Sequence, residues 1–341
     1  MRRILGLLGV WLALVIGGCS TAGGAGEEVE LRLGYFPNVT HAPAIVGIED
    51  GLLAQALGEN VALAPQAFNA GPDVIEAIFS GALDASYIGP NPAINGFTRS
   101  NGEALRIVAG TTSGGAALVV SEEIASPDDL AGATLGSPQL GNTQDVALRA
   151  WLTDEGFTTD LEGGGDVSIM PQANGQALEA FIAGEIDGAW VPEPWATRMV
   201  GEGGGHVLVN EADLWPDGEF VTTHLIVATE FLEAHPDVVR DLLVGHVDAV
   251  NAVNDDPSGA QATVAAALGE LTGSSLPDGT LERAWENLAF TVDPIAASLA
   301  TSAQHAADLG LLDDPDLDGI YDLSVLNEVL REAGQPEISA P

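Results

Sequence analysis

The sequence predicts an α/β protein built from two similar lobes that face a common cleft. Residues 184–195 read as a Gly turn, a short buried strand ending in an aromatic residue, and a Pro-rich loop. Residues 81–92 repeat this pattern at a constant offset of 103, so that Tyr87 matches Trp190. Two such units in register indicate two lobes, each of which presents a strand end and a loop to the space between them.

The composition supports a large core divided between two lobes. Of the 341 residues, 46% are hydrophobic, but only nine are Phe, six Trp and three Tyr. The core must therefore be built mainly from Ala, Val, Leu and Ile. A chain of this length is long enough for two lobes or domains.

The charge is strongly acidic. Fifty acidic residues stand against ten basic residues, all of them Arg, and the formal net charge is −40. A field of this sign repels nucleic acid and anionic membrane surfaces. It favours solubility in salty surroundings, where charges are screened. We therefore expect no nucleic-acid partner and a salt-tolerant source.

The N-terminus has the pattern of a targeting segment. Arg2 and Arg3 precede an apolar run at 4–16 that is short for a membrane span, and small residues lead to the sole cysteine, Cys19. Ile16-Gly17-Gly18-Cys19 resembles the lipobox of bacterial lipoproteins, which implies a signal peptide at 1–18 and lipidation of Cys19. The alternative is a buried Cys in an ordinary signal peptide or anchor. The small-residue stretch within 19–28 favours a flexible tether.

The first part of the fold, residues 29–114, is predicted to contain a βαβ pattern. Its strands are expected at 29–36, 61–68 and 85–88, the second at a sheet edge because of Pro65. A helix is expected to begin near Pro43 and stop at Gly51, and another to follow the loop at 69–73, where Pro and Asp favour a first helical turn.

The second lobe is expected over residues 115–219. Its strands are predicted at 116–120, 133–138 and 167–170, after a strand at 105–111 that leads into the first crossing between lobes. Helices are expected after Ser126, along the apolar positions Val146, Leu148, Trp151 and Leu152, and at 174–183. A return strand at 220–228 opens the last segment, 220–341. From Glu230 onward the pattern predicts helices only, with breaks near 255–257, 272–279 and 313–319.

Several motifs occur in an order typical of one family. They are Leu31-Arg32-Leu33-Gly34-Tyr35, Ala70-Gly71-Pro72, the Gly81-x-Leu83-Asp84 turn with Gly89, Ser126-Pro127-Asp128-Asp129-Leu130-Ala131-Gly132, and residues 186–195. On these motifs the chain resembles the solute-binding lipoproteins of ABC importers, in the nitrate, sulfonate and taurine group. The resemblance covers roughly residues 29–250. It implies a two-lobed periplasmic-binding-protein fold of type II, the venus-flytrap fold, with two hinge crossings and closure on a ligand.

The resemblance also implies a function. We expect an extracytoplasmic protein, attached to the cell membrane only through its lipid, that captures a small organic sulfonate such as taurine or an alkylsulfonate, or a related oxyanion. It would deliver this ligand to ABC permease and ATPase subunits, as a monomer and without a cofactor. Alternative ligands are an anion such as nitrate or bicarbonate, or a cationic heterocycle such as a thiamine-precursor pyrimidine.

Candidate ligand contacts follow from the rule that open α/β sheets bind ligands outside the carboxyl ends of their strands, where loops enter helix N-termini. The first lobe contributes Asn38, Thr40, His41, Asn69, Gly71, Gly89, Pro90 and Asn91, and the second contributes Gln139, Asn142, Thr143, Asn174, Trp190 and Glu193. Near the crossings lie Thr111, Thr112, Ser113, Thr222, Thr223 and His224. Such a set of amides, hydroxyls and backbone N–H groups can hold an oxyanion without any Arg.

Each candidate has a structural alternative. Asn and Gly after strands are often turn residues, and Trp190 and Trp195 could equally fill a core. His41 and His224 could be hydrogen-bonded structural residues. Glu193 lies between two prolines at an expected helix start, which favours a first-turn acid. If it faced the ligand instead, it would repel a simple anion and favour a solute with an amine.

Residues 314–319 match the first half of a calcium loop, with Asp314, Asp316 and Asp318 as candidate ligands. The twelfth position would be Val325 rather than Glu, so the bidentate ligand is missing. This favours a solvated acidic turn over a metal site.

An enzyme on the same fold, such as one of cofactor biosynthesis, is the other functional class. The absence of Lys excludes a Schiff base, lipidation of Cys19 would exclude a thiol nucleophile, and no Ser lies in a Gly-x-Ser-x-Gly elbow. Only His41 with Glu193 could form an acid–base pair. A sensor domain would need a transmembrane or signalling segment that the sequence does not show. We therefore predict a binding protein rather than an enzyme.

Overall fold

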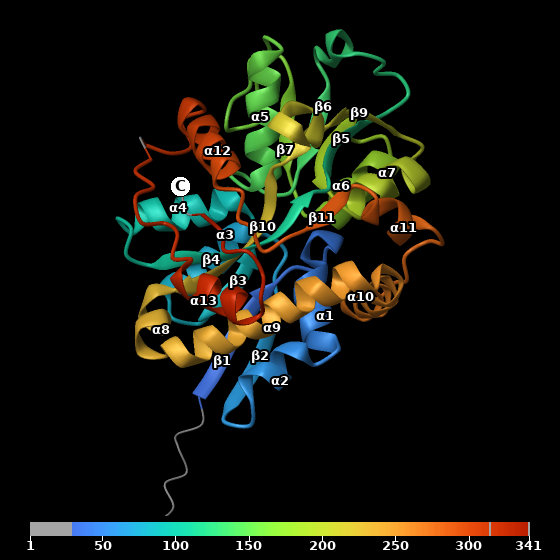
Figure 1. Ribbon diagram of the computed structural model, residues 1–341. Helices are drawn as coiled ribbons and strands as arrows, with labels where there is room; N and C mark the ends of the chain where they lie inside the picture. Colours follow the sequence, from blue (N-terminus) through green and yellow to red (C-terminus); the bar gives the residue numbers. More distant parts are fainter. Residues whose placement is uncertain (1–28, 314, 340–341) are drawn as a thin grey trace, which may run out of the picture.

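The computed structural model describes residues 29–313 and 315–339. The chain forms two sheets, each flanked by helices (Figure 1). The first sheet has the strand order β11-β4-β10-β3-β1-β2, and the second has the order β7-β6-β8-β5-β9. We call the first sheet with its helices lobe I, and the second sheet with its helices lobe II. The α/β two-domain class predicted from the sequence is confirmed.

Lobe I collects the two ends of the described chain. Its strands are β1 (Val29–Tyr35), β2 (Val61–Ala67), β3 (Ala85–Ile88), β4 (Leu105–Gly114), β10 (Val221–Ala228) and β11 (Leu288–Phe290). Its helices are η1 (Val39–His41), α1 (Ala42–Glu49), α2 (Leu52–Leu57), α3 (Gly71–Phe79), α4 (Pro90–Arg99), α8 (Thr229–Ala234), α9 (Pro236–Asp255), α10 (Pro257–Thr272), α11 (Thr280–Trp285), α12 (Ala296–Asp308) and α13 (Ser324–Glu332).

Lobe II is formed by the middle of the chain. Its strands are β5 (Ala116–Val120), β6 (Thr134–Ser137), β7 (Ser168–Pro171), β8 (Gly188–Pro192) and β9 (His206–Asn210). Its helices are η2 (Pro127–Leu130), α5 (Thr143–Asp154), α6 (Asn174–Ile182), α7 (Trp195–Gly203), η3 (Glu211–Leu214) and η4 (Pro216–Gly218). The chain crosses between the sheets after β4 and again between β9 and β10. We propose lobe boundaries at these crossings, after residue 114 and before residue 220.

The internal repeat is visible in the structure. Helices α3 and α6 and strands β3 and β8 begin at the same offset of 103 that the sequence shows. Each of the two strands has a parallel neighbour on one side, β1 or β6, and an antiparallel one on the other, β10 or β5. The two lobes therefore place equivalent strand ends and helix N-termini toward each other.

Several sequence expectations need correction. The stretch after Glu230 is not entirely helical, because β11 adds an antiparallel edge strand to β4. Strand β9 was not predicted. The Pro-rich loops after β3 and β8 lead directly into α4 and α7, since Pro90 and Pro194 stand where proline is compatible with a helix start. Pro65 does lie in an edge strand, β2.

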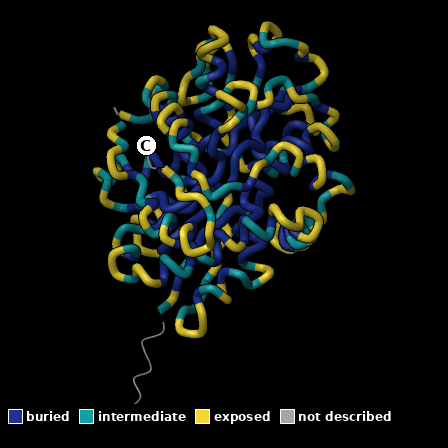
Figure 2. Tube along the Cα trace, viewed as in Figure 1, coloured by how far each residue is buried: buried dark blue, intermediate teal, exposed yellow. Residues whose placement is uncertain are grey.

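The core follows the two sheets. Buried segments run through the centre of both lobes, and exposed ones form the periphery (Figure 2). Helix α9 packs across α1 and α2 on lobe I, whereas α12 lies between α4 of lobe I and α5 of lobe II (Figure 1). Within the described residues, no helix has the length and apolar character needed to cross a membrane.

Candidate ligand cleft

A small polar cavity lies between the lobes. Its lining residues come from the strand ends and loops of both sheets: Phe36, Asn38, Thr40, His41, Asn69, Gly89, Asn142, Thr143, Gln144, Asn174, Pro192 and Thr222. The enclosed space is only ≈ 20 Å³, which is room for about one water-sized group. Nine of the contacts predicted from the sequence meet here: Asn38, Thr40, His41, Asn69, Gly89, Asn142, Thr143, Asn174 and Thr222.

Helix N-termini surround this cavity. Gly89 and Asn142 are the N-cap residues of α4 and α5, and Asn174 is the first residue of α6. The first N–H groups of a helix have no acceptor within it, and the helix dipole concentrates positive potential there. Helices from both lobes thus supply the cavity with donors and partial positive charge, without any formally charged side chain.

His41 is a neutral hydrogen-bond donor. Its Nδ1 accepts the Phe36 backbone N–H at 3.3 Å, and the Phe36 ring lies 4.5 Å from the imidazole, centroid to centroid. Burial lowers the pKa of the imidazole to about 3. Because a backbone N–H can only donate, the proton of the neutral ring is on Nε2. His41 therefore offers Nε2–H to a ligand across the neutral pH range.

Asn38 is oriented by a residue of the other lobe. The Trp195 indole N–H donates to Asn38 Oδ1 at 2.8 Å. Since an indole nitrogen only donates, this contact fixes the amide and leaves Nδ2 as a donor. The same hydrogen bond joins lobe II to lobe I beside the cavity, so it contributes to closure.

The backbone of the first loop is held in place from two strands. The Thr40 carbonyl accepts the hydroxyl of Thr112 on β4 at 2.7 Å and that of Thr223 on β10 at 3.0 Å. These bonds fix η1, which carries His41. Thr223 therefore positions the site without lining it.

Two buried polar atoms of the lining have no hydrogen-bond partner among the described residues. They are Thr143 Oγ1 and Asn174 Oδ1, both on lobe II. Buried polar groups are nearly always paired with protein, water or a ligand. A bound group could accept from or donate to the Thr143 hydroxyl, but it would satisfy Asn174 Oδ1 only by donating a hydrogen bond.

Neither Asp, Glu nor Arg lines the cavity among the described residues. The nearest buried ion pair is internal to lobe II: Arg149 Nε lies 3.0 Å from Asp145 Oδ2. Asp145 also accepts the Ser137 hydroxyl and the Gly141 backbone N–H, so this pair holds the loop that leads into α5. The charge it contributes is balanced and lies behind the cavity wall.

Glu193 caps its helix and does not face the cavity. It is 2% exposed, its carboxylate accepts the backbone N–H and hydroxyl of Thr197 at 3.1 and 3.0 Å, and Asn287 of lobe I donates to it at 2.7 Å. Burial raises the pKa of Glu193, opposed by these hydrogen bonds and by Arg283. Glu193 is therefore not in the first turn of α7: it precedes the N-cap residue Pro194, and from there its carboxylate accepts the Thr197 backbone N–H. Through Asn287 it is also a second link between the lobes.

Trp190 also lies away from the ligand space. Its side chain is fully buried in lobe II, and its indole N–H donates to Glu211 Oε2 at 2.7 Å. The equivalent Tyr87 is buried in lobe I, with its hydroxyl 3.1 Å from His246 Nδ1. The repeated aromatic positions are thus core residues with satisfied polar tips, because their strands are covered on both faces.

The other candidates stand around the cavity rather than in its lining. Gly71 packs against α4, where an added Cβ would lie 2.2 Å from Pro92, and Asn91 donates to the Ser302 carbonyl at 3.1 Å. His224 Nε2 lies 2.9 Å from the Pro294 carbonyl, and burial lowers the pKa of this histidine to about 4. Pro90, Thr111, Ser113 and Gln139 are likewise outside the lining.

Three lining residues were not among the sequence candidates: Phe36, Gln144 and Pro192. Phe36 directly follows β1, Gln144 is the second residue of α5, and Pro192 ends β8. Gln144 and Pro192 are each next to a selected position, and Phe36 is two residues from one. To predict these three residues, one would need to know to within one residue where each strand or helix ends, and the sequence pattern does not determine this.

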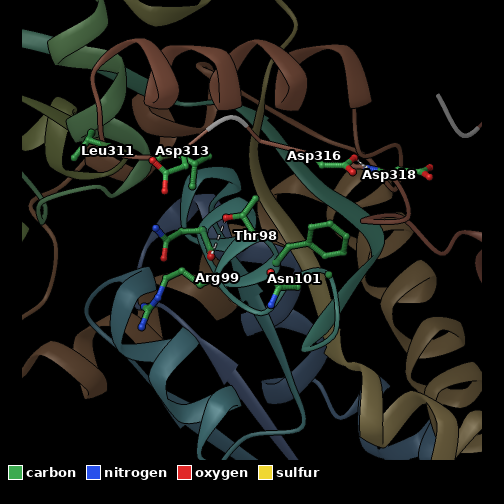
Figure 3. Close-up of a pocket in the computed structure, with 11 residues that line it drawn as sticks. Thr98, Arg99, Asn101, Leu311, Asp313, Asp316 and Asp318 are labelled. Carbon is green, nitrogen blue, oxygen red and sulfur yellow. Dashed lines mark hydrogen bonds between the residues drawn. The ribbon is translucent and has the colours of Figure 1, made fainter.

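The described residues of the acidic turn near residue 316 form no metal cluster. Asp314 lies outside the described residues, and Asp316 accepts the Asp318 backbone N–H at 3.0 Å, as a turn carboxylate does. This loop and α4 line a separate pocket, distinct from the ligand cavity. Figure 3 shows Asp316 and Asp318 on the loop, with Asp313 apart from them across that pocket. The described residues contain no group of three or more His, Cys, Asp or Glu placed to hold a metal.

Comparison with known proteins agrees with this architecture. The model of the NMT1-like family matches residues 24–269. The chain belongs to the NMT1-like family. Curated relatives include the taurine-binding periplasmic protein of Escherichia coli (strain K12), 26% identical over 65% of this chain, and the bicarbonate transport ATP-binding protein CmpC of Synechocystis sp. (strain ATCC 27184 / PCC 6803 / Kazusa), 27% identical over 55%. These alignments span 66% and 30% of the relatives' own lengths.

Solved structures with the same fold superpose on most of the chain. The alkanesulfonate-binding protein SsuA from Xanthomonas axonopodis pv. citri, bound to MOPS, has a TM-score of 0.69 at 23% identity, covering 84% of this chain and 94% of its own. The periplasmic nitrate-binding protein NrtA from Synechocystis PCC 6803 has a TM-score of 0.73 at 15% identity, covering 91% and 90%. This NMT1-like protein therefore has the two-lobed periplasmic-binding-protein fold.

The lipidation site predicted at Cys19 lies outside the described residues.

Proposed function

We propose that this protein is the extracytoplasmic solute-binding component of an ABC importer and that it captures a small oxyanion between its lobes. The ligand class we favour is an organic sulfonate, such as taurine or an alkylsulfonate, with the compact anions nitrate and bicarbonate as the alternative. The protein is anchored through a lipid on Cys19, acts as a monomer and passes its ligand to permease and ATPase subunits.

The observation that carries this proposal is the donor-rich and uncharged lining of the cavity. His41 Nε2–H, Asn38 Nδ2, the Thr143 hydroxyl and the first N–H groups of α5 and α6 can all donate. A ligand that only accepts hydrogen bonds matches such a set, and helix N-termini stabilise its negative charge. A sulfonate, nitrate or bicarbonate group has this chemistry.

The same lining distinguishes between the ligand classes. No carboxylate of the described residues lines the cavity, and Glu193 points to its own helix and to Asn287. A cationic heterocycle would thus lack a counter-charge, which disfavours a thiamine-precursor pyrimidine. The cavity volume, which has room for about one water-sized group, is smaller than the anionic head of a sulfonate, so the lobes must part to admit it. A sulfonate with an organic body requires them to part further.

Related proteins support a binding role rather than catalysis. The E. coli relative is named as a taurine-binding protein, and the two structural neighbours as alkanesulfonate-binding and nitrate-binding proteins. His41 and Glu193, the one pair considered for acid–base chemistry, do not share the cavity lining. His41 is engaged with Phe36 and Glu193 with Thr197, so neither is arranged for proton transfer to a common ligand.

Calorimetric titration tests the proposal. Mature protein carrying Cys19→Ser is titrated with sodium nitrate, bicarbonate, taurine and a short alkanesulfonate, with sodium chloride as the reference salt. We expect saturable binding of one oxyanion per chain. His41→Ala should weaken it at least about tenfold, because a buried ligand oxygen loses its donor. His206→Ala on β9, outside the cavity, is the matched control and should bind as the unmodified chain does.

Two outcomes would contradict the proposal. One is saturable binding of a pyrimidine heterocycle with none of the oxyanions bound. The other is conversion of a bound solute to a product, detected by mass spectrometry after prolonged incubation.

A further inference from the structure

A second pocket lies on the seam between the lobes, away from the ligand cavity. It encloses ≈ 340 Å³ between α5, the η3–η4 segment and α12. Helix α12 comes from lobe I and lies beside α5 of lobe II (Figure 1). This seam pocket shares no lining residue with the ligand cavity. An occupant would contact both lobes at once.

Aromatic rings from three elements line the seam pocket: Trp151 on α5, Trp215 between η3 and η4, and His305 on α12. One face of Trp215 is stacked on Phe220, with centroids 5.6 Å apart and an interplanar angle of 12°. The centroids of Trp215 and His305 are 6.2 Å apart, with the rings tilted by 47°. Such aromatic faces attract cations through their quadrupole.

A buried carboxylate also lines the seam pocket. Glu211 is 2% exposed and accepts the Trp190 indole N–H at 2.7 Å, and no Arg of the described chain lines the pocket. Asp154 on α5 adds a second acid. Burial raises the pKa of Glu211 to about 7, although the Trp190 and Trp215 indoles oppose the shift. A buried carboxylate without a cation is costly when ionised, and a nearby positive charge would remove that cost.

We propose that the seam pocket binds a small organic cation of the substituted-ammonium class. Aromatic walls and a desolvated carboxylate together recognise a cation with an apolar shell. They do not suit a bare metal ion, because such an ion needs several oxygen ligands around one point. The described residues of the pocket do not provide such a cluster. Because its walls come from both lobes, the occupant stabilises the closed arrangement. This site is independent of the oxyanion assignment.

The test uses tetramethylammonium chloride as the probe, titrated into mature Cys19→Ser protein at pH 8, with sodium chloride keeping the ionic strength constant. We expect one saturable site per chain. Glu211→Gln and Trp215→Leu should each weaken binding at least about tenfold, since each removes one half of the recognition. Trp285→Leu, which removes a lobe I tryptophan packed against Phe290, is the matched control and should not change it.

Absence of saturable binding would overturn the proposal, as would equal weakening by Trp285→Leu. If a variant fails to fold, the test is made on the unmodified protein by following its indole N–H resonances by NMR during the titration. The proposal requires Trp151 and Trp215 to shift on titration while Trp285 does not, and the opposite pattern refutes it. Nitrate or taurine titrations on the same samples show separately whether the ligand cavity functions.

Discussion

Gly89 is a position where contact between the two lobes leaves little room for a side chain. It lies on lobe I at the N-cap of α4 with φ −71° and ψ 160°, a conformation open to any residue. A Cβ added there would lie 2.4 Å from Thr143 Oγ1 and 3.4 Å from Thr143 Cβ, across the cavity on lobe II. Gly89→Ala should therefore leave each lobe folded but oppose closure.

The expected magnitude follows from the contact. Rotation about χ1 of Thr143 would move the hydroxyl away by placing either the methyl or the β hydrogen there, but a β-branched side chain has few allowed rotamers and its Cβ stays at 3.4 Å, so relief is partial. Overpacking of this kind costs about 1–3 kcal/mol, and the affinity for an oxyanion should fall by about 5- to 150-fold. Thermal stability without ligand should change little, because the clash exists only when the lobes meet.

A double-variant cycle isolates the effect in the same calorimetric assay. Thr143→Ala removes Oγ1 and leaves an ordinary contact at 3.4 Å, so Gly89→Ala should cost little in that background. Gly269→Ala in α10, where the nearest atom is 4.0 Å away, is the control and should not alter affinity. An equal loss from Gly89→Ala in both backgrounds, or none in either, would refute the reasoning.

Three further predictions concern individual groups. Trp195→Phe removes the interlobe hydrogen bond to Asn38, so oxyanion affinity should fall about 2- to 12-fold by calorimetry; Trp285→Phe should not change it. Because the pKa of His41 is about 3, nitrate affinity should be flat from pH 6 to 8, and a tenfold change per pH unit would contradict a neutral donor. For Glu211 the folded pKa of about 7 exceeds the ordinary 4.5, so stability is lost as pH rises between these values. In urea unfolding, the free energy of unfolding of Glu211→Gln relative to that of the unmodified protein should therefore rise by about 3 kcal/mol between pH 4 and pH 8. A difference that stays constant over this pH range would argue against a buried acid.

Much of the fold could be predicted because it depends on local patterns that repeat. The offset of 103 located α3 with α6 and β3 with β8, and Pro65 marked the edge strand. Strand β11 was missed because its three residues pair with β4 from far along the chain. Neither alternation nor turn chemistry identifies a strand whose stability comes from a distant partner.

The site could be predicted only in part, because some of its features depend on local sequence and others on distant neighbours. Loops after strands are identified by sequence, and nine of the predicted contacts do meet in one cavity. Which way a side chain points is decided by neighbours that the sequence does not reveal. Glu193 turns to Thr197 and Asn287, and Trp190 turns to Glu211, because each finds there the partner that a buried polar group needs.

The placement of the acidic residues explains how an acidic protein can bind an anion. Outside the predicted signal peptide the chain carries eight Arg against 50 acids, formally −42, yet its ligand cavity is lined by no acid of the described residues. At physiological salt, charges beyond about 8 Å are largely screened, so short-range donors can hold an anion inside an acidic protein. The buried acids Glu193 and Glu211 are directed to the outer seams between the lobes. Repulsion is thereby kept out of the cavity. Glu193 also links the lobes because Asn287 of lobe I donates to it, whereas Glu211 accepts its hydrogen bond from Trp190 within lobe II.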